Sequence, residues 1–139
     1  MADRAIIDTS AWIAYYLSDD KYHSKIKKIL KELIANKIVI CTSNDIVDET
    51  VTRLIYTTNP RIVKKFIDFT RESLRTKNLI ELWIDEQLQQ EALALTLKFS
   101  EHKLSLTDCT TIALLNRFNI GSLVTLDSDF KKVGISVIS

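Results

Sequence analysis

The chain is poor in the residues that interrupt regular structure: its 139 residues include only two glycines and one proline. Because turns and loops depend heavily on these residues, we expect most of the chain to form helices and strands. Its two cysteines, Cys41 and Cys109, are too few for a disulfide framework and lack the spacing of metal ligands. We expect each to be a small buried apolar residue.

The sequence also lacks a long hydrophobic run, since no stretch approaches the ~18 apolar residues that a membrane-spanning helix needs. Its first residues do not show the basic and then apolar pattern of a secretion signal. We therefore expect a cytoplasmic protein with no membrane partner. An apolar content of 46% and a length of 139 residues predict one globular domain over residues 1–139.

The charges nearly cancel: 18 acidic and 19 basic residues give a net charge of +1. If several of the acids gather in one site, the remaining surface must be net basic. A basic surface suits a polyanionic partner such as a nucleic acid.

A stretch from Ala5 to Trp12 is the most informative part of the chain. The apolar run Ala5-Ile6-Ile7 has the length and β-branching of a buried strand. It ends in a carboxylate, Asp8, and Thr9 and Ser10 follow as expected N-cap residues of an apolar helix. Asp8 is thus expected where a strand meets a helix, either as a further cap or as a ligand at the carboxyl end of a parallel strand.

Strand-like and helix-like segments alternate along the rest of the chain. Further strands are expected at 37–42, 79–84, 123–126 and 135–138, and helices at 9–17, 24–36, 44–57, 61–77, 85–100 and 108–118, with a half-turn of helix before the last strand. This alternation predicts a three-layer α/β/α sandwich around a mainly parallel five-stranded sheet.

Several acids fall where such a sheet would bring them together. Asp8 follows the first strand, Asp127 and Asp129 follow the fourth, and Asp108 begins the helix that leads into the fourth strand. An acid on the helix after the second strand would join them, but periodicity does not choose among Asp45, Asp48 and Glu49.

Carboxylates that converge repel one another unless a cation neutralises them. Oxygen ligands without histidine or cysteine select Mg²⁺ or Mn²⁺, and these ions catalyse phosphodiester hydrolysis. Each acid also has a structural alternative. Ser105 to Asp108 fits a capping box, Asp127 to Asp129 fits an Asx turn, and Glu49 lies off the apolar stripe of its helix.

Four segments resemble, in order, the motifs of PIN-domain nucleases. They are Ile-Ile-Asp-Thr-Ser-Ala-Trp at 6–12, Val-Asp-Glu-Thr-Val-Thr-Arg-Leu at 47–54, Leu-Ser-Leu-Thr-Asp-Cys-Thr-Thr-Ile-Ala at 104–113 and Val-Thr-Leu-Asp-Ser-Asp-Phe at 124–130. Each motif is short, but together they span residues 6 to 130 in the order of the family.

The resemblance implies a PIN-like fold that binds Mg²⁺ or Mn²⁺ and cuts single-stranded RNA. It implies that Asp8 and Asp108 are the principal metal ligands, that Glu49 completes the site or orients a water, and that Asp127 holds metal or water. It also selects Glu49 over Asp45 and Asp48. Supporting roles are implied for three further residues, which are Ser10, Thr107 and Asp129.

Many small PIN proteins are the toxins of VapBC-type toxin–antitoxin pairs, often dimeric and blocked by a peptide of the partner. The resemblance therefore implies a VapC-like endoribonuclease with an antitoxin partner. Three alternatives are a PIN-fold RNA-processing nuclease outside such a pair, a non-catalytic RNA- or protein-binding module, and another aspartate-dependent phosphotransfer domain. The last fits poorly, because Ser10 stands where a haloacid-dehalogenase phosphatase has its second aspartate.

Overall fold

The computed structural model describes residues 3–139, and strands and helices alternate along them as the periodicity predicts. The strands are β1 (Arg4–Ile7), β2 (Val39–Ser43), β3 (Leu79–Leu82), β4 (Ser122–Val124) and β5 (Val137–Ile138). The helices are α1 (Thr9–Tyr16), α2 (His23–Ala35), α3 (Asn44–Thr57), α4 (Pro60–Arg75), α5 (Glu86–Lys98), the 3₁₀ turn η1 (Ser100–His102), α6 (Leu106–Arg117) and α7 (Asp129–Lys132).

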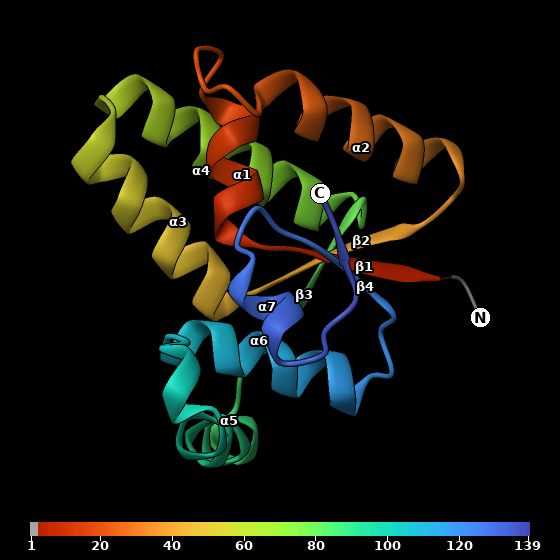
Figure 1. The fold of residues 1–139 in the computed structure, drawn as a ribbon. Coiled ribbons are helices and arrows are strands. Elements are labelled where there is room, and N and C mark those ends of the chain that lie inside the picture. Colours follow the sequence, from red (N-terminus) through yellow and green to blue (C-terminus); the bar gives the residue numbers. More distant parts are fainter. Residues whose placement is uncertain (1–2) are drawn as a thin grey trace.

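The five strands form one sheet in the order β3-β2-β1-β4-β5, and every neighbouring pair is parallel. The predicted three-layer α/β/α fold is thus confirmed. In Figure 1, α2 and α4 lie on one side of the sheet and α5 and α6 on the other. From β1 the chain first builds the sheet outward through β2 and β3, and then returns to place β4 on the other side of β1. The topological switch point therefore lies between β1 and β4.

Apolar side chains of β1 and α6 form the centre of the molecule. Ala5, Ile6 and Ile7 are fully buried, as the short apolar run at the start of the chain predicts. Both cysteines are buried and free, which confirms their expected role as small apolar residues. Within residues 3–139, no helix has the length and apolar content required to cross a membrane.

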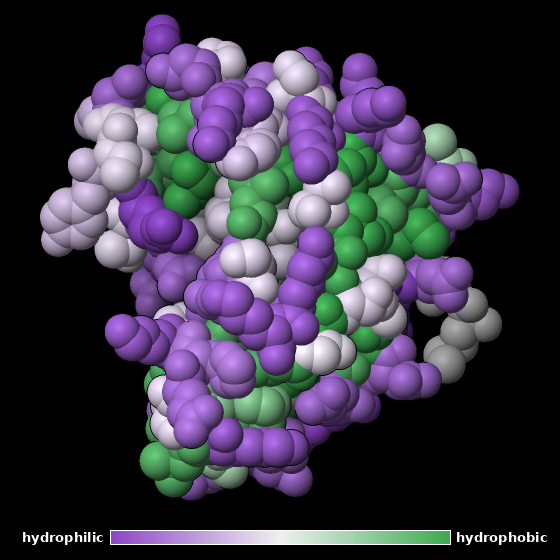
Figure 2. Space-filling view, viewed as in Figure 1, coloured by the Kyte–Doolittle hydropathy of each residue, from purple (hydrophilic) through white to green (hydrophobic). Residues whose placement is uncertain are grey.

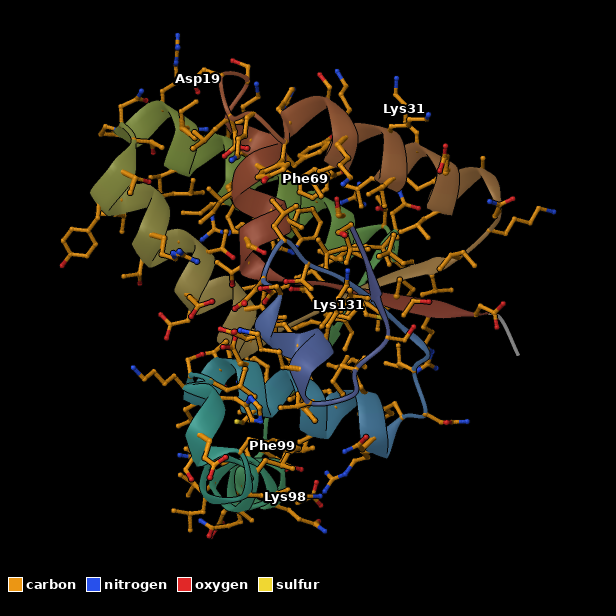
Figure 3. All side chains as sticks on the ribbon, viewed as in Figure 1. Asp19, Lys31, Phe69, Lys98, Phe99 and Lys131 are labelled. Carbon is orange, nitrogen blue, oxygen red and sulfur yellow. The ribbon has the colours of Figure 1, made fainter. Side chains whose placement is uncertain are left out.

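An aromatic cluster joins α1 to α4. Trp12 meets Phe66 and Phe69 edge-on, with ring centroids 6.3 and 5.9 Å apart, and Tyr16 meets the same two rings at 5.4 and 5.9 Å. In Figure 3, Phe69 lies beside α1, whereas Lys31 points away from α2. These rings pack against one another in offset, edge-to-face geometry, so Trp12 and Tyr16 contribute to packing.

Some element boundaries differ from the sequence expectation. Thr9 and Ser10 lie inside the first turn of α1, and Asp8 occupies the N-cap position. The expectation that Thr9 and Ser10 cap this helix was therefore wrong, because the backbone already turns helical at Thr9. β3 and β5 are also shorter than expected, and each covers only part of its apolar run.

Helix α3 begins at a buried serine. Ser43 is fully buried, and its Oγ accepts a 3.0 Å hydrogen bond from the backbone N–H of Ile46. This bond satisfies one of the free N–H groups at the start of the helix. It also fixes where α3 leaves β2, and thereby where the acidic residues of α3 lie relative to the sheet.

We predict that Ser43→Ala lowers the free energy of unfolding by about 1 to 2 kcal/mol, because it leaves a buried N–H without an acceptor. Urea unfolding followed by circular dichroism measures the change. Ser24→Ala is the control, since Ser24 is exposed on α2 and should lose less than about 0.5 kcal/mol. Equal losses in the two variants would show that the Ser43 cap does not stabilise α3.

Candidate active site

Asp8 is the residue between β1 and α1, at the switch point of the sheet. Its backbone N–H donates a 2.9 Å hydrogen bond to the carbonyl of Val124, which continues the pairing of β1 with β4 by one residue. Its carbonyl accepts hydrogen bonds from the N–H groups of Ala11 and Trp12 in α1. The backbone of Asp8 therefore performs the capping role that was one alternative for this residue.

The Asp8 side chain takes no part in that cap. Its Oδ2 accepts hydrogen bonds from Oγ1 of Thr125 at 2.8 Å and from Oγ of Ser10 at 3.2 Å. The side chain is only 4% exposed, and Oδ1 is buried without a hydrogen-bond partner among residues 3–139. A buried carboxylate oxygen without a donor is costly, so Oδ1 is the atom that most needs an external ligand.

Burial, above all, raises the pKa of Asp8 from 3.8 to about 6. The hydrogen bond from Thr125 opposes this rise, while the negative charges of Asp108 and Glu49 add to it. Burial also raises the pKa of Asp108, and Asp127 and Glu49 add to that rise by charge repulsion. Carboxylates from separate elements thus lie close enough to repel one another.

Asp108 is the third residue of α6 and belongs to a capping box. Oγ of Ser105 accepts a 3.0 Å hydrogen bond from the N–H of Asp108, and Oδ2 of Asp108 accepts one of 3.0 Å from the N–H of Ser105. The capping alternative for Asp108 is therefore correct. However, it uses only Oδ2, and within residues 3–139 no group donates to Oδ1.

Asp127 shows the same division between its two oxygens. Its Oδ1 accepts a 2.9 Å hydrogen bond from the N–H of Asp129, as the expected Asx turn requires. No donor within the described chain reaches its Oδ2. Asp129 instead directs its carboxylate to the ammonium group of Lys132 at 3.1 Å.

Glu49 lies on α3, and its side chain is half-buried. Its charge acts on both Asp8 and Asp108. Asp45 and Asp48 lie on the same helix but line a neighbouring hollow instead. Of the three acids that periodicity left open, Glu49 is therefore the one that faces the other carboxylates.

One cavity of about 430 Å³ collects these side chains at the carboxyl ends of β1 and β4. Its lining consists of the four carboxylates of Asp8, Glu49, Asp108 and Asp127, together with Ser10, Arg53, Ser105 and Leu126. Two residues to which the sequence assigned supporting roles do not line it. Asp129 is paired with Lys132, and Thr107 lines the neighbouring hollow, where its carbonyl accepts hydrogen bonds from two threonines of α6.

Sequence reasoning missed Thr125, which links both sides of the switch point. Its Oγ1 donates to Asp8 and accepts a 3.0 Å hydrogen bond from the N–H of Asp127. Ser10 makes the corresponding link from α1, because its Oγ accepts a 3.0 Å hydrogen bond from the N–H of Leu126. The available signal was a threonine two residues before Asp127 in the fourth motif. Arg53 was also missed, although it stands in the second motif.

The donor set of the cavity fits a hard divalent cation. The possible ligand atoms that the described residues offer are all oxygens, and Asp8 presents a buried oxygen with no partner in that part of the chain. Among residues 3–139, no three potential ligand side chains are already clustered tightly enough to hold a metal directly. An ion bound by one or two carboxylates, with water in its remaining positions, suits such an arrangement and is the habit of Mg²⁺.

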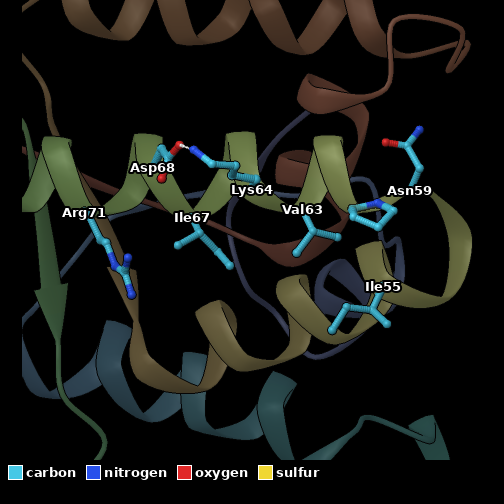
Figure 4. A pocket seen from close by; sticks show the side chains of 8 residues that line it. Ile55, Asn59, Val63, Lys64, Ile67, Asp68 and Arg71 are labelled. Atoms are coloured by element: carbon cyan, nitrogen blue, oxygen red, sulfur yellow. Dashed lines mark hydrogen bonds and ion pairs between the residues drawn. The ribbon is translucent and has the colours of Figure 1, made fainter.

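Two other hollows carry no carboxylate cluster. One, of about 520 Å³, lies between α1, α2 and α4, and apolar side chains such as Trp12, Leu30 and Phe69 line much of it. An apolar area is visible beside α2 in Figure 2. The other lies between α3 and α4, where Ile55, Val63 and Ile67 face it and Lys64 pairs with Asp68 (Figure 4).

Comparisons with known proteins agree with this fold. The model of the PIN domain family matches residues 5–136. No curated protein matches the sequence. Among solved structures, the Mycobacterium tuberculosis toxin VapC20, described as cleaving the Sarcin-Ricin loop, has a TM-score of 0.79 at 24% identity over 95% of this chain and 96% of its own.

Two further structures are similar over almost their whole length. VapBC2 from Rickettsia felis, bound to a DNA fragment from its promoter, has a TM-score of 0.72 at 14% identity, with 97% of each chain covered. A toxin–antitoxin complex from Klebsiella pneumoniae has a TM-score of 0.63 at 21% identity, covering 97% of this chain and 96% of that one.

The raised pKa of Asp8 predicts a pH-dependent stability in metal-free protein. Because the folded-state pKa is about 6 and the reference value is 3.8, the contribution of protonated Asp8 to stability is fully present below about pH 4. It is lost as the pH rises through 6, and the whole loss is about 3 kcal/mol. In chelator, the stability of Asp8→Asn relative to wild type should therefore rise by about 2 to 3 kcal/mol from pH 4 to pH 7.5.

Urea unfolding at the two pH values measures this change, and effects of the amide that do not depend on pH cancel. Asp19→Asn is the control, since Asp19 is exposed in the turn before α2. A stability difference for Asp8→Asn that stays constant between the two pH values would contradict the prediction.

Proposed function

The chain belongs to the PIN-domain family, and from this premise we propose that it is a Mg²⁺- or Mn²⁺-dependent endoribonuclease that hydrolyses single-stranded RNA. One observation carries the proposal. The acids of all four PIN-like motifs line one cavity, and the most buried of them has an oxygen that finds no partner within residues 3–139.

Each residue of the site has a separate proposed role. Asp8 and Asp108 would be the principal metal ligands, each through the oxygen that takes no internal hydrogen bond. Asp127 would hold metal or water through its own free oxygen, and Glu49 would complete the site or orient a water. Thr125 and Ser10 would fix the Asp8 carboxylate, as hydrogen bonds to ligating carboxylates do.

A bound divalent cation would supply two things: a lower pKa for the attacking water, and positive charge against the phosphate and the leaving oxygen. The cavity lies at the surface on the switch point of the sheet, where an extended strand of RNA can reach it. Single-stranded RNA as the substrate is inferred from the family resemblance, and the description of VapC20 as a toxin that cleaves the Sarcin-Ricin loop supports it.

We further propose that the protein is the toxin of a VapBC-type pair and acts in the cytoplasm as a homodimer. Similar structures include toxin–antitoxin complexes, and the apolar hollow between α1, α2 and α4 offers apolar surface to an antitoxin segment. A neighbouring gene for a small DNA-binding protein would support this proposal. Its absence would favour a PIN-fold RNA-processing nuclease.

The competing non-catalytic module predicts no metal binding. A module that only binds RNA or protein has no use for four repelling carboxylates around one cavity. Titration of the protein with Mn²⁺ by calorimetry separates the two functions, because heat of binding is expected for the nuclease alone.

We predict that Asp8→Asn combined with Asp108→Asn lowers kcat/KM for a single-stranded oligoribonucleotide by at least about a thousandfold, because several kcal/mol of transition-state stabilisation would be lost with the metal. Asp19→Asn combined with Glu32→Gln is the control, since it removes two exposed acids outside the lining of the cavity. Full activity in the Asp8/Asp108 variant would assign the cleavage to another site or to a contaminant.

We predict that Thr125→Val weakens Mn²⁺ binding about 10- to 100-fold, because Oδ2 of Asp8 loses its shorter hydrogen bond and the backbone N–H of Asp127 loses its acceptor. Calorimetry measures the affinity. Thr125→Ser keeps the hydroxyl and should bind Mn²⁺ nearly as well as wild type. Unchanged affinity in Thr125→Val would mean that the hydroxyl does not hold Asp8 in place.

A further inference from the structure

Among residues 3–139, Arg53 is the one cationic residue that lines the acidic cavity. It lies on α3 one turn after Glu49, and it also lines the neighbouring hollow of about 630 Å³. Among residues 3–139, the two hollows share Glu49 and Arg53 alone. Arg53 therefore stands at the boundary between them, beside one route into the active site from α3.

The guanidinium of Arg53 has no protein partner in the described residues. Its side chain is exposed, and none of the ion pairs or side-chain hydrogen bonds within residues 3–139 includes it. This is unexpected for a cation beside four carboxylates, since oppositely charged groups three or four residues apart on a helix commonly pair. The contrast with α4 is direct, where Lys64 pairs with Asp68 and Arg75 with Glu72.

We propose that Arg53 binds a backbone phosphate of the RNA at the mouth of the active site, as a positioning residue for the substrate. A phosphate entering a cavity of four carboxylates is repelled, and an arginine at the rim offsets this repulsion. The planar guanidinium also binds two phosphate oxygens at once, which fixes orientation.

The neighbouring hollow indicates where the sugar and base attached to that phosphate would lie. Asp45 and Asp48 line that hollow, so a second phosphate would meet like charge there. Leu106, which is 39% exposed, offers apolar surface there. An RNA strand whose phosphate is bound at Arg53 can direct its sugar and base toward Leu106 while its next phosphate enters the acidic cavity.

The inference rests on the proposed nuclease function, and it predicts a specific signature for Arg53→Gln. With a single-stranded oligoribonucleotide at low salt, KM should rise about 10- to 100-fold with kcat nearly unchanged, because a charge-assisted hydrogen bond to the bound substrate is lost. The slope of log(kcat/KM) against log salt concentration should become shallower by about 0.7, the value for one phosphate contact on a single strand.

Two variants serve as controls. Arg53→Lys keeps the charge, so the salt slope of wild type should remain even if bidentate binding is lost. Arg61→Gln removes an exposed cation at the start of α4, outside the lining of both hollows, and should change neither KM nor the slope. Mn²⁺ affinity measured by calorimetry should not fall in Arg53→Gln, whereas damage to the site itself would lower it.

Binding can be measured without cleavage by repeating the comparison in the Asp8→Asn, Asp108→Asn background with a fluorescently labelled oligoribonucleotide. Arg53→Gln should weaken binding and reduce its salt slope there as well. If Arg53→Gln remains an active nuclease and its salt slope is unchanged, the role of Arg53 is overturned while the proposed function stands. A wild-type protein that neither binds nor cleaves RNA overturns the proposed function, and the role of Arg53 with it.

Discussion

The buried carboxylate of Asp8 is the constraint on which the rest of the site depends. Asp8 lies at the switch point of a parallel sheet and is 4% exposed, with one oxygen held by Thr125 and the other without a donor among the residues that the structure describes. Keeping it charged there costs about 3 kcal/mol, a sizeable part of the 5 to 15 kcal/mol that stabilises a typical domain. Such a cost is expected at a site whose bound ligand offsets it.

The fold keeps this arrangement by linking the ends of β1 and β4. The backbone of Asp8 pairs with Val124, Thr125 joins the Asp8 carboxylate to the backbone of Asp127, and Ser10 binds the backbone of Leu126. These links tie the loop after β4 to the start of α1. Glu49 and Asp108 then approach from α3 and α6, whose first turns are fixed by the caps at Ser43 and Ser105.

The sheet and the helices could be predicted because they follow from periodicity, and the parallel topology accounts for the acids that follow its strands. Glu49 was selected by the resemblance to the PIN motifs, since periodicity left it open. Ala5 to Ile7 reads as a buried strand and is one, and Asp8 and Asp127 follow neighbouring strands as the alternation requires. Thr125 and Arg53 could not be found in this way. The role of Thr125 depends on the rotamer that brings its hydroxyl to Asp8 across two strands. The role of Arg53 depends on its guanidinium having no ion-pair partner among residues 3–139. Neither property produces a periodic pattern in the sequence.

The structural role of an acid and its proposed role as a metal ligand are compatible, because a carboxylate has two oxygens. Asp108 uses one oxygen for its capping box, Asp127 one for its Asx turn, and Asp8 one for Thr125. In each case the internal hydrogen bond orients the side chain and leaves its second oxygen without an internal donor. A motif that looks like an ordinary cap can therefore also be a means of aiming a ligand. The three residues that carry these oxygens line one cavity, and this supports the proposal that they are ligands of one site.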